Sequence, residues 1–474
     1  MRAAVDGATA GAPHAEHIAS ASSAPAHLTR PAVFIHILQE ATHCPGCRLA
    51  FAWRSQKPRR LERAVARSCR RRKKHCEARI VITASGASFW MPTFNNHVLT
   101  LTAGALFATS ACGGHTTVPF ASQVSAPGAS SIVPDDTHSI LKKLTKDVKI
   151  GSTVDPKNGD MGPRAISVAR STFGLKKGQL VVCNFDDSAG TAGKGTTIEV
   201  LDPHPHSKLR TFAQSSKVGG CVGDATTATN YVYGAGLSSD RVSKFDPTGS
   251  LKKSYGSPVQ VPFADADAFC GLPYAPEDIY IADSKTGSII KLAFIPVSRS
   301  GHAKLTQVMT GFGVNKGSGW GVLGPSGVQY NSTRIGNLCN DTLYIVDGVN
   351  NTVIAVSTAS NLLAKDEIIV LPGGKRFKCA HPKATCARLV YSGSPLNAPV
   401  ASALLPNGNL IVANTKGGNT LVELTPTGKV LATKIIDTST TAHVFGLLAT
   451  GTTDSDTALF YTDTETNTLH ELEQ

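Results

Sequence analysis

Six stretches of the chain repeat one pattern: a short apolar strand ending in Asp, Asn or a small residue, a turn rich in Gly, Asn or Ser, and a second apolar strand. The last residues of the first strands lie 51, 48, 64, 67 and 49 positions apart. A unit of this length cannot bury its apolar face alone, so neighbouring copies must pack together. Six such units predict an all-β fold, a closed six-bladed β-propeller with four-stranded antiparallel blades. The six strands are Leu180–Asn184, Tyr231–Ala235, Ile279–Asp283, Leu343–Asp347, Leu410–Asn414 and Leu459–Asp463.

The ends of the repeat region predict how the ring closes. The last unit stops at Gln474, directly after its third strand, and so lacks an outer strand. We expect the stretch around 144–150 to supply it, because this would leave no exposed sheet edge. Two spacings exceed 60 residues, which predicts insertions near 294–326 and 358–396. Long loops on a rigid ring are where binding often resides, although a purely structural loop is an equal alternative.

The basic charge of the chain is concentrated at its front. Residues 1–90 hold 15 Lys and Arg against 5 Asp and Glu, a balance of +10, and only +3 of the total of +13 belongs to the remainder. We therefore expect no nucleic-acid partner for the propeller. Residues 1–90 have no apolar periodicity and are interpreted as a basic extension outside the natural product. Residues 113–140 predict a flexible tether, and residues 141–474 the propeller.

An apolar run of 14 residues, 98–111, lies directly before Cys112 and soon after Met91. It is too short to span a bilayer and is typical of the core of a secretory signal. Small residues before a Cys resemble the bacterial lipobox, which implies lipidation of Cys112 and a signal segment over 91–112. A plain cleaved signal and an N-terminal anchor are the alternatives. The resulting expectation is an exported, monomeric lipoprotein, held to the membrane by its lipid and facing the periplasm or cell surface.

Six cysteines follow Cys112, and an even number in an exported protein permits disulfides. Cys379 and Cys386 flank a short polar loop and are the pair we expect to be bridged. Cys183 lies inside an apolar strand and is interpreted as a small buried thiol. The pairing of Cys183, Cys221, Cys270 and Cys339 stays open at this stage.

Two segments resemble a known repeat. Pro325–Val353 contains Asp-Thr-Leu-Tyr-Ile-Val-Asp followed by Asn and Val, and Asn407–Gly428 contains Asn-Leu-Ile-Val-Ala-Asn before a Gly-Gly-Asn turn. Both resemble the NHL repeat, and the likeness extends over about residues 160–474. It implies the propeller architecture and leaves the function open, because that family includes protein-binding, RNA-binding and catalytic members.

A more distant resemblance is to the gluconolactonase-like propellers, which hold one divalent metal in the central channel. The strand Ile279–Ser284 is similar to a strand of that family, which implies a cation such as calcium near Asp267 or Asp283. The entry strand over 267–273 lacks the Asn of that family, and the first entry strand offers Arg164 where a Glu is expected. A hard cation needs several converging oxygen ligands, and the sequence presents no complete set.

The polar residues that end the six strands have two interpretations. They form either a ring of ligands or a set of caps that bond to the turn after each strand, and repetition in every blade favours caps. His443, at the entry to the last blade, is a candidate general base without a paired nucleophile. His204 and His206 lie in a Pro-rich turn, where solvated side chains are expected rather than metal ligands.

These patterns predict a binding or scaffold module at the cell envelope, with an unknown protein or small molecule as its ligand. The entry strands show no acid–base or metal constellation, which favours binding over catalysis. The main alternative is a metal-dependent, lactonase-like hydrolase with its site in the central channel. A quinone-dependent redox propeller is less favoured, since only three Trp occur and no cofactor motif is present.

Overall fold

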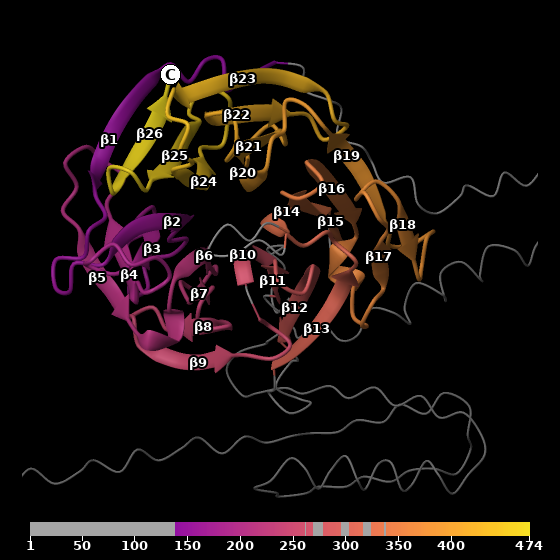
Figure 1. Ribbon diagram of the computed structural model, residues 1–474, viewed down its shortest axis with the longest axis horizontal. Coiled ribbons are helices and arrows are strands. Elements are labelled where there is room, and N and C mark those ends of the chain that lie inside the picture. Colours follow the sequence, from indigo (N-terminus) through magenta and orange to yellow (C-terminus); the bar gives the residue numbers. More distant parts are fainter. Residues whose placement is uncertain (1–137, 261, 269–277, 295–302, 316–323, 336–337) are drawn as a thin grey trace, which may run out of the picture. The chain divides into compact units, whose positions relative to one another are not determined.

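A computed structural model describes residues 138–474, apart from 261, 269–277, 295–302, 316–323 and 336–337. Its strands form six β-sheets arranged around a central axis, which is the six-bladed β-propeller predicted from the repeats (Figure 1). Each blade runs outward from an inner strand beside the axis to an outer strand at the rim. In the described part of the chain, no helix has the length and apolar character needed to cross a bilayer.

Two 3-10 turns, η1 (Ser216–Val218) and η3 (Ala359–Asn361), lie between strands of the propeller. Blades 1 to 3 follow one another along the first half of the ring. The strands of these blades, from the axis outward, are β2 (Met161–Val168), β3 (Leu180–Asp186), β4 (Thr197–Leu201) and β5 (Arg210–Gln214); β6 (Cys221–Thr226), β7 (Val232–Gly236), β8 (Arg241–Phe245) and β9 (Leu251–Tyr255); β10 (Pro262–Ala268), β11 (Asp278–Asp283), β12 (Ser288–Phe294) and β13 (Ala303–Thr310).

Blades 4 to 6 complete the ring, and two strands of an insertion join blade 3 from outside. The strands are β14 (Pro325–Ile335), β15 (Leu338–Asp347), β16 (Thr352–Ser357) and β19 (Ala387–Ser392); β20 (Pro399–Leu404), β21 (Leu410–Asn414), β22 (Asn419–Leu424) and β23 (Val430–Asp437); β24 (Val444–Thr450), β25 (Ala458–Asp463), β26 (Thr468–Glu473) and β1 (Lys146–Ser152); and the inserted β17 (Ile368–Val370) and β18 (Phe377–Cys379).

The hydrophobic core lies between neighbouring blades. The second strand of each blade is apolar on both faces, and every residue of β21 is buried. Between blades 4 and 5, for example, Val346 and Val353 belong to the same cluster as Leu410 and Val422. A strand packed on both faces reads as a continuous apolar run, which explains why the second strands carry the repeat signal.

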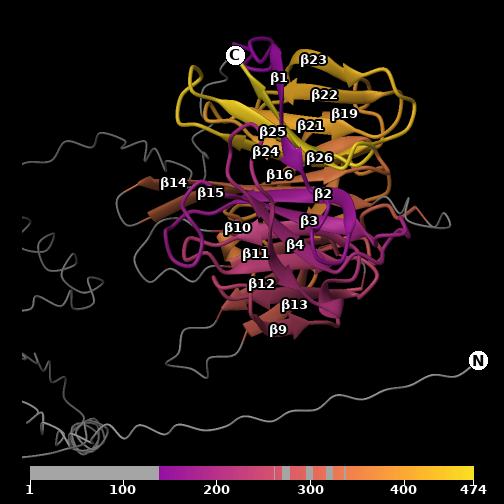
Figure 2. The ribbon, with the colours of Figure 1, turned by 90° about the vertical axis from the view of Figure 1, so that its left-hand side faces the viewer.

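The ring is closed by the N-terminal end of the propeller, as the missing outer strand predicted. β1 pairs antiparallel with β26, with Lys146 opposite Glu473 and Ser152 opposite Thr468. The Tyr461 hydroxyl also donates a 2.6 Å hydrogen bond to Asp147. Figures 1 and 2 show β1 beside β26, next to the C-terminus. This pairing joins the two ends of the propeller in one sheet and covers the edge of blade 6.

The two long spacings have different structural causes. The region 294–326 contains β13, the ordinary outer strand of blade 3, so part of this expected insertion is wrong. The region 358–396 contains β17 and β18, which extend blade 3, and then β19, which completes blade 4. The second spacing therefore includes a segment that leaves its own blade and joins its neighbour.

Candidate functional site

The inner strands of all six blades share one irregularity. In each, a residue at or near the start of the inner strand pairs with an Asp, an Asn or, in blade 2, a Gly of the second strand, and the register shifts by one residue immediately afterwards. We call the end of the ring where this occurs the bulge face, and the six extra residues the bulge ring. A β-bulge redirects the extra side chain and is common near functional sites. The bulge ring comprises Arg164, Val222, Phe263, Ser326, Val400 and Phe445.

Arg164 is the one charged residue of the bulge ring. The side chain of Phe263 lies outside the described residues; of the other five, Val222, Ser326 and Val400 are buried. Arg164 and Phe445, from the neighbouring blades 1 and 6, keep part of their surface exposed. The accessible part of the described bulge ring therefore lies between blades 1 and 6, and it includes the cation of Arg164.

The Arg164 guanidinium is held mainly by aromatic rings. Its Cζ lies 3.8 Å from the ring centroid of Phe185 and 4.2 Å from that of Phe445, within the range of a cation–π interaction. Burial lowers the pKa of Arg164 to about 10, and Asp186 opposes this shift, so the group is charged at neutral pH. Its buried Nε has no hydrogen-bond partner in the described chain. Buried donors are normally paired, so this one calls for an explanation.

The backbone brings Asp186 close to this cation. Gly162 has a φ of +74°, and a Cβ at this position would lie 2.4 Å from Oδ2 of Asp186. Only glycine adopts this conformation readily and leaves room for the carboxylate. Burial raises the pKa of Asp186, while Arg164 acts in the opposite direction. The buried Oδ1 of Asp186 also has no hydrogen-bond partner among the described groups.

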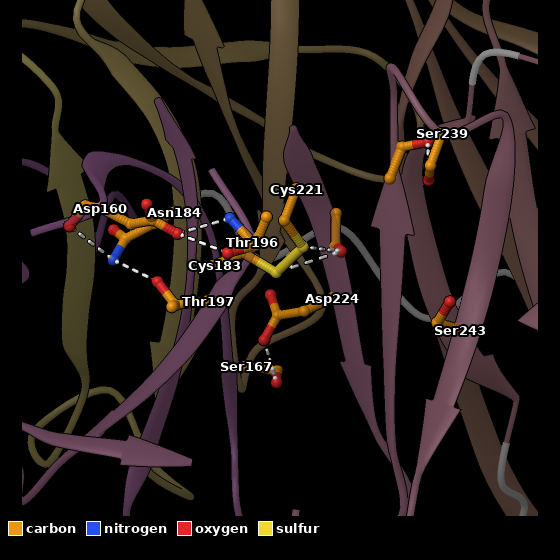
Figure 3. The surroundings of a disulfide bond; sticks show 12 residues. Asp160, Ser167, Cys183, Asn184, Thr196, Thr197, Cys221, Asp224, Ser239 and Ser243 are labelled. Atoms are coloured by element: carbon orange, nitrogen blue, oxygen red, sulfur yellow. Dashed lines mark hydrogen bonds between the residues drawn. A yellow bond between two sulfur atoms is a disulfide. The ribbon is translucent and has the colours of Figure 1, made fainter. Parts of the chain in front are cut away.

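A polar cluster joins the inner strands of blades 1 and 2, two residues further along β6 than its bulge. The Ser167 hydroxyl donates a 2.6 Å hydrogen bond to Asp224 and lies 2.7 Å from the Thr226 hydroxyl. Figure 3 shows Asp224 and Ser167 beside the disulfide between Cys183 and Cys221. Burial raises the pKa of Asp224 to about 7, and the bond from Ser167 opposes it. This cluster therefore buries a carboxyl group whose pKa is raised well above its ordinary value.

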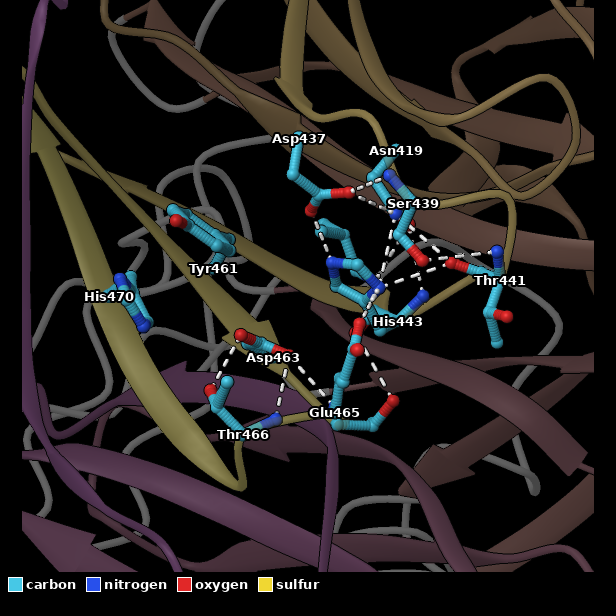
Figure 4. A network of polar contacts seen from close by, with 12 residues as sticks. Asn419, Asp437, Ser439, Thr441, His443, Tyr461, Asp463, Glu465, Thr466 and His470 are labelled. Atoms are coloured by element: carbon cyan, nitrogen blue, oxygen red, sulfur yellow. Dashed lines mark hydrogen bonds and ion pairs between the residues drawn. The ribbon is translucent and has the colours of Figure 1, made fainter.

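His443 occupies a closed network at the bulge face (Figure 4). Its Nε2 contacts Asp437, and its Nδ1 lies 3.1 Å from both Glu465 Oε2 and Asn419 Nδ2. The His443 amide donates to Asn419 Oδ1 at 2.9 Å. A general base needs a ring nitrogen directed at a substrate, and both nitrogens of His443 already have partners. The network instead fixes the crossover from β23 to β24, so the expected role of His443 as a base gains no geometric support.

Neither metal candidate has an observed ligand set. Asp283 is fully buried and accepts hydrogen bonds from the amides of Gln260, at 2.6 Å, and Thr286, at 3.0 Å. Asp267 lies in β10 opposite Ile279, and its side chain is outside the described residues. Among the residues whose placement is described, no group of three or more His, Cys, Asp and Glu could hold a metal ion.

The recurrent polar residues act as caps in three blades. Asp347 accepts from the amides of Val349 and Asn350, Asp463 accepts from the two amides of its own turn, and Asp283 accepts from Thr286. Asn414 instead bonds to the preceding segment, where it accepts from the amide of Asn397. The cap interpretation is therefore confirmed in part. In blade 2 the equivalent position is Gly236 rather than Ala235, because Gly236 pairs with the first residue of β6.

Two disulfides lie within the described chain. Cys379 and Cys386 are joined, and this is the pair expected from the sequence. Cys183 is bonded to Cys221, so its interpretation as a free buried thiol is wrong. The second bridge links β3 of blade 1 to β6 of blade 2, strands that approach only in the folded ring. Cys112 and Cys270 lie outside the described residues, as does the side chain of Cys339.

Two grooves lie away from the axis. One, of about 400 Å³, is on the bulge face between blades 4 and 5 and is lined by Val349, Asn351, Asn397 and Lys416 among others. The other, of about 430 Å³, lies between blades 6 and 1 at the opposite face and is lined in part by Arg170 and Phe460. Neither includes the candidate residues named from the sequence.

Solved structures with the same class of fold include enzymes of different chemistry. A streptogramin B lyase shares 14% identity over 69% of this chain and 86% of that one, with a TM-score of 0.39. A catalytically inactive virginiamycin B lyase from Staphylococcus aureus, solved with quinupristin, shares 12% over 69% and 99%, with a TM-score of 0.39. Kuenenia stuttgartiensis hydrazine synthase shares 11% over 68% and 98%, with a TM-score of 0.36. No protein-family model and no curated protein sequence matches the chain. These likenesses concern the fold alone.

The sequence contained a signal for the bulge ring that strand patterns alone did not reveal. In every blade the residue after the bulge is Ala or Gly, and four of the six strands have Pro directly before the bulge. Alignment of the six entry strands on this pattern would have isolated Arg164 as the charged exception. The small residues are Ala165, Gly223, Ala264, Gly327, Ala401 and Gly446.

Proposed function

We propose that this protein is an exported, lipid-anchored binding module of the cell envelope, and that its propeller binds an amphipathic anion at Arg164. The observation that carries the proposal is the environment of this residue. Arg164 is a charged group in an otherwise uncharged ring, it stacks on two phenylalanines, and its Nε lacks a partner within the described chain. An acidic group would satisfy the guanidinium, and Phe445 offers adjoining apolar surface.

The other parts of the proposal have separate support. The apolar run before Cys112 and the small residues next to it support export and lipidation. Two disulfides in the propeller agree with an oxidising compartment, where such bonds persist. Binding is favoured over hydrolysis because the caps at the bulge face are occupied by their own turns, and His443 is enclosed by its network.

The ligand site can be tested with two fluorescent probes of matched shape. Anilinonaphthalene sulfonate carries an anion, whereas N-phenylnaphthylamine has the same rings without it. We expect the anionic probe to bind saturably and the neutral probe to bind at least tenfold more weakly. We call the ratio of the two affinities the anionic preference, and we expect Arg164→Met to reduce this ratio at least tenfold. The control is Arg210→Met, which removes an exposed cation from β5.

Equal binding of the two probes, no binding up to millimolar concentration, or an unchanged preference in Arg164→Met would overturn the ligand site. The anchor is tested independently, by labelling cells with radioactive palmitate. We expect label in the wild-type chain and none in Cys112→Ser. Label that persists in the variant would exclude Cys112 as the lipidated residue without affecting the ligand site.

A further inference from the structure

The insertion between β16 and β19 adds a two-stranded extension to the outer edge of blade 3. β17 runs parallel to β13, with Met309 opposite Ile368, and β18 returns antiparallel to β17. Figure 1 shows β17 and β18 at the outer rim of the ring. We call residues 368–386, from β17 through the loop closed by Cys386, the basic hairpin. Blade 3 is the six-stranded exception among the described sheets.

The basic hairpin is fastened to the ring at several points. The Leu371 amide donates to the carbonyl of Arg376 at 2.9 Å, which closes its turn. At that turn, a Cβ on Gly374 would lie 3.0 Å from the side chain of Asn350 in blade 4. At the other end, the disulfide at Cys379 closes the loop, and Thr358 Oγ1 donates to the carbonyl of Ala384 at 2.7 Å. Groups on this hairpin are therefore held in fixed positions.

The charge of this hairpin is one-sided. No Asp or Glu occurs between Glu367 and Glu423, whereas Lys375, Arg376, Lys378 and Lys383 all lie in the hairpin and are exposed. Within the described residues none of the four forms an ion pair. Other lysines do: Lys146 pairs with Glu473, Lys252 with Asp246 and Lys291 with Asp278. The propeller thus carries an unneutralised cationic strip on a rigid projection.

Strand alternation sets the geometry of the strip. Phe377 and Cys379 pack against the core of blades 3 and 4, so the alternate residues Arg376 and Lys378 face away from it. Two positions along a strand are about 6.6 Å apart, which spaces these charges in a row. Lys375 extends the row at the turn, and Lys383 lies in the disulfide loop at the other end. A row of this kind matches charges repeated along a linear polymer.

We propose that the basic hairpin is a docking strip for a linear acidic polysaccharide. A lysine on an edge strand also prevents sheet aggregation, but that role requires neither four cations nor a disulfide-closed loop. None of the exposed large apolar side chains of the propeller lies within the hairpin, whereas docking into a bilayer surface uses such groups. The disulfides argue for an oxidising compartment such as the cell exterior, where acidic polysaccharides occur.

The test measures binding of a fluorescent heparin octasaccharide by anisotropy at 50 mM salt. The test variant is Lys375→Glu/Arg376→Glu/Lys378→Glu. The control, Lys142→Glu/Lys208→Glu/Arg210→Glu, removes three exposed cations elsewhere and changes the net charge equally. We expect the hairpin variant to lose at least tenfold in affinity and the control less than threefold, with both melting within 2 °C of the wild type.

A second arm uses vesicles with 30% phosphatidylglycerol. We expect no retention of the protein on them at the same salt concentration. Equal losses in the two variants would reduce the binding to net charge and overturn the proposal, and so would an unchanged affinity in the hairpin variant. Binding to vesicles without binding to the octasaccharide would replace the polysaccharide with a lipid surface. Arg164→Met is expected to leave this binding unchanged, which separates the docking strip from the ligand site.

Discussion

Glu199, in the middle of β4, must keep its proton in the folded protein at neutral pH. It is completely buried, and neither carboxylate oxygen has a hydrogen-bond partner in the described chain. Its neighbour is the carboxyl group of Asp155, which accepts hydrogen bonds from Thr211 and from the amides of Lys157 and Asn158. Burial and a neighbouring negative charge both oppose ionisation, so one carboxyl group of such a pair keeps its proton.

The hydrogen bonds decide which of the two carries the proton. Burial works against ionisation of Asp155, but the bonds from Thr211 and the two amides outweigh it and hold the pKa of Asp155 below its ordinary value. For Glu199, burial first and Asp155 second raise the pKa from 4.5 to about 9. We therefore assign the proton to Glu199.

The shift predicts how stability depends on pH. In the unfolded chain Glu199 loses its proton near its ordinary value of 4.5, whereas the folded protein keeps it up to about 9. Between these values the folded state binds one more proton, so this group makes stability fall as the pH rises, by about 1.4 kcal/mol per pH unit. Its contribution is complete below pH 4.5, and it declines by about 4 kcal/mol between pH 5 and pH 8.

The substitution Glu199→Gln retains the shape and removes the titration. We expect the variant to match the wild type within about 1 kcal/mol at pH 5 and to be more stable by about 4 kcal/mol at pH 8, measured by guanidinium unfolding at both values. Val200→Ala, at the adjacent buried position, is the control and should change stability equally at the two pH values. A difference between Glu199→Gln and wild type that does not vary with pH would refute the retained proton of Glu199.

Two further predictions concern the disulfides and the caps. The bridged cysteines lie 38 and 7 residues apart. From the loss of chain entropy, we expect Cys183→Ala/Cys221→Ala to lower the free energy of unfolding by about 4 kcal/mol and Cys379→Ala/Cys386→Ala by about 2 kcal/mol. Guanidinium unfolding measures both values, and a larger loss at the shorter bridge would contradict this estimate. Asp283→Ala leaves two partly buried amides without this acceptor and should cost about 1–3 kcal/mol, whereas Asp283→Asn keeps one acceptor oxygen and should cost less. Stoichiometric calcium in the wild-type protein that Asp283→Asn abolishes would instead indicate a ligand role.

The closed ring could be predicted because its determinants are local and repeated. A second strand buried between two blades is apolar on both sides, and its turn needs a residue that bonds to the following amides. The first property appears in six consecutive stretches of sequence, and the second in three of them. The missing outer strand of blade 6 was equally visible, since the apolar runs of the last repeat account for only three strands. The pairing of β1 with β26 follows from the need to cover that edge.

The features that escaped prediction depend on contacts between distant segments. Cys183 and Cys221 lie in different repeats, and nothing in either strand indicates that β3 and β6 approach each other at that level. The basic hairpin lies in the chain between two strands of blade 4, yet β17 pairs with β13 of blade 3. Arg164 was visible as an unexpected residue in an entry strand, but its partners Phe185 and Phe445 come from β3 and from the last blade.

Departure from the repeat does not by itself indicate function. Blade 2 has Gly236 where other blades have Asp or Asn, and packing explains this exception because a Cβ there would lie 2.8 Å from backbone atoms of Val218. Arg164 differs from Gly236, because an arginine at this position relieves no clash. It places a buried charge in the ring, and its Nε has no hydrogen-bond partner in the described chain. Unsatisfied chemistry of this kind costs stability and is expected to persist where a ligand compensates for it. The basic hairpin is a separate case, because its exposed cations are hydrated and its signal is the absence, within the described residues, of the acidic partners found beside other lysines of the ring.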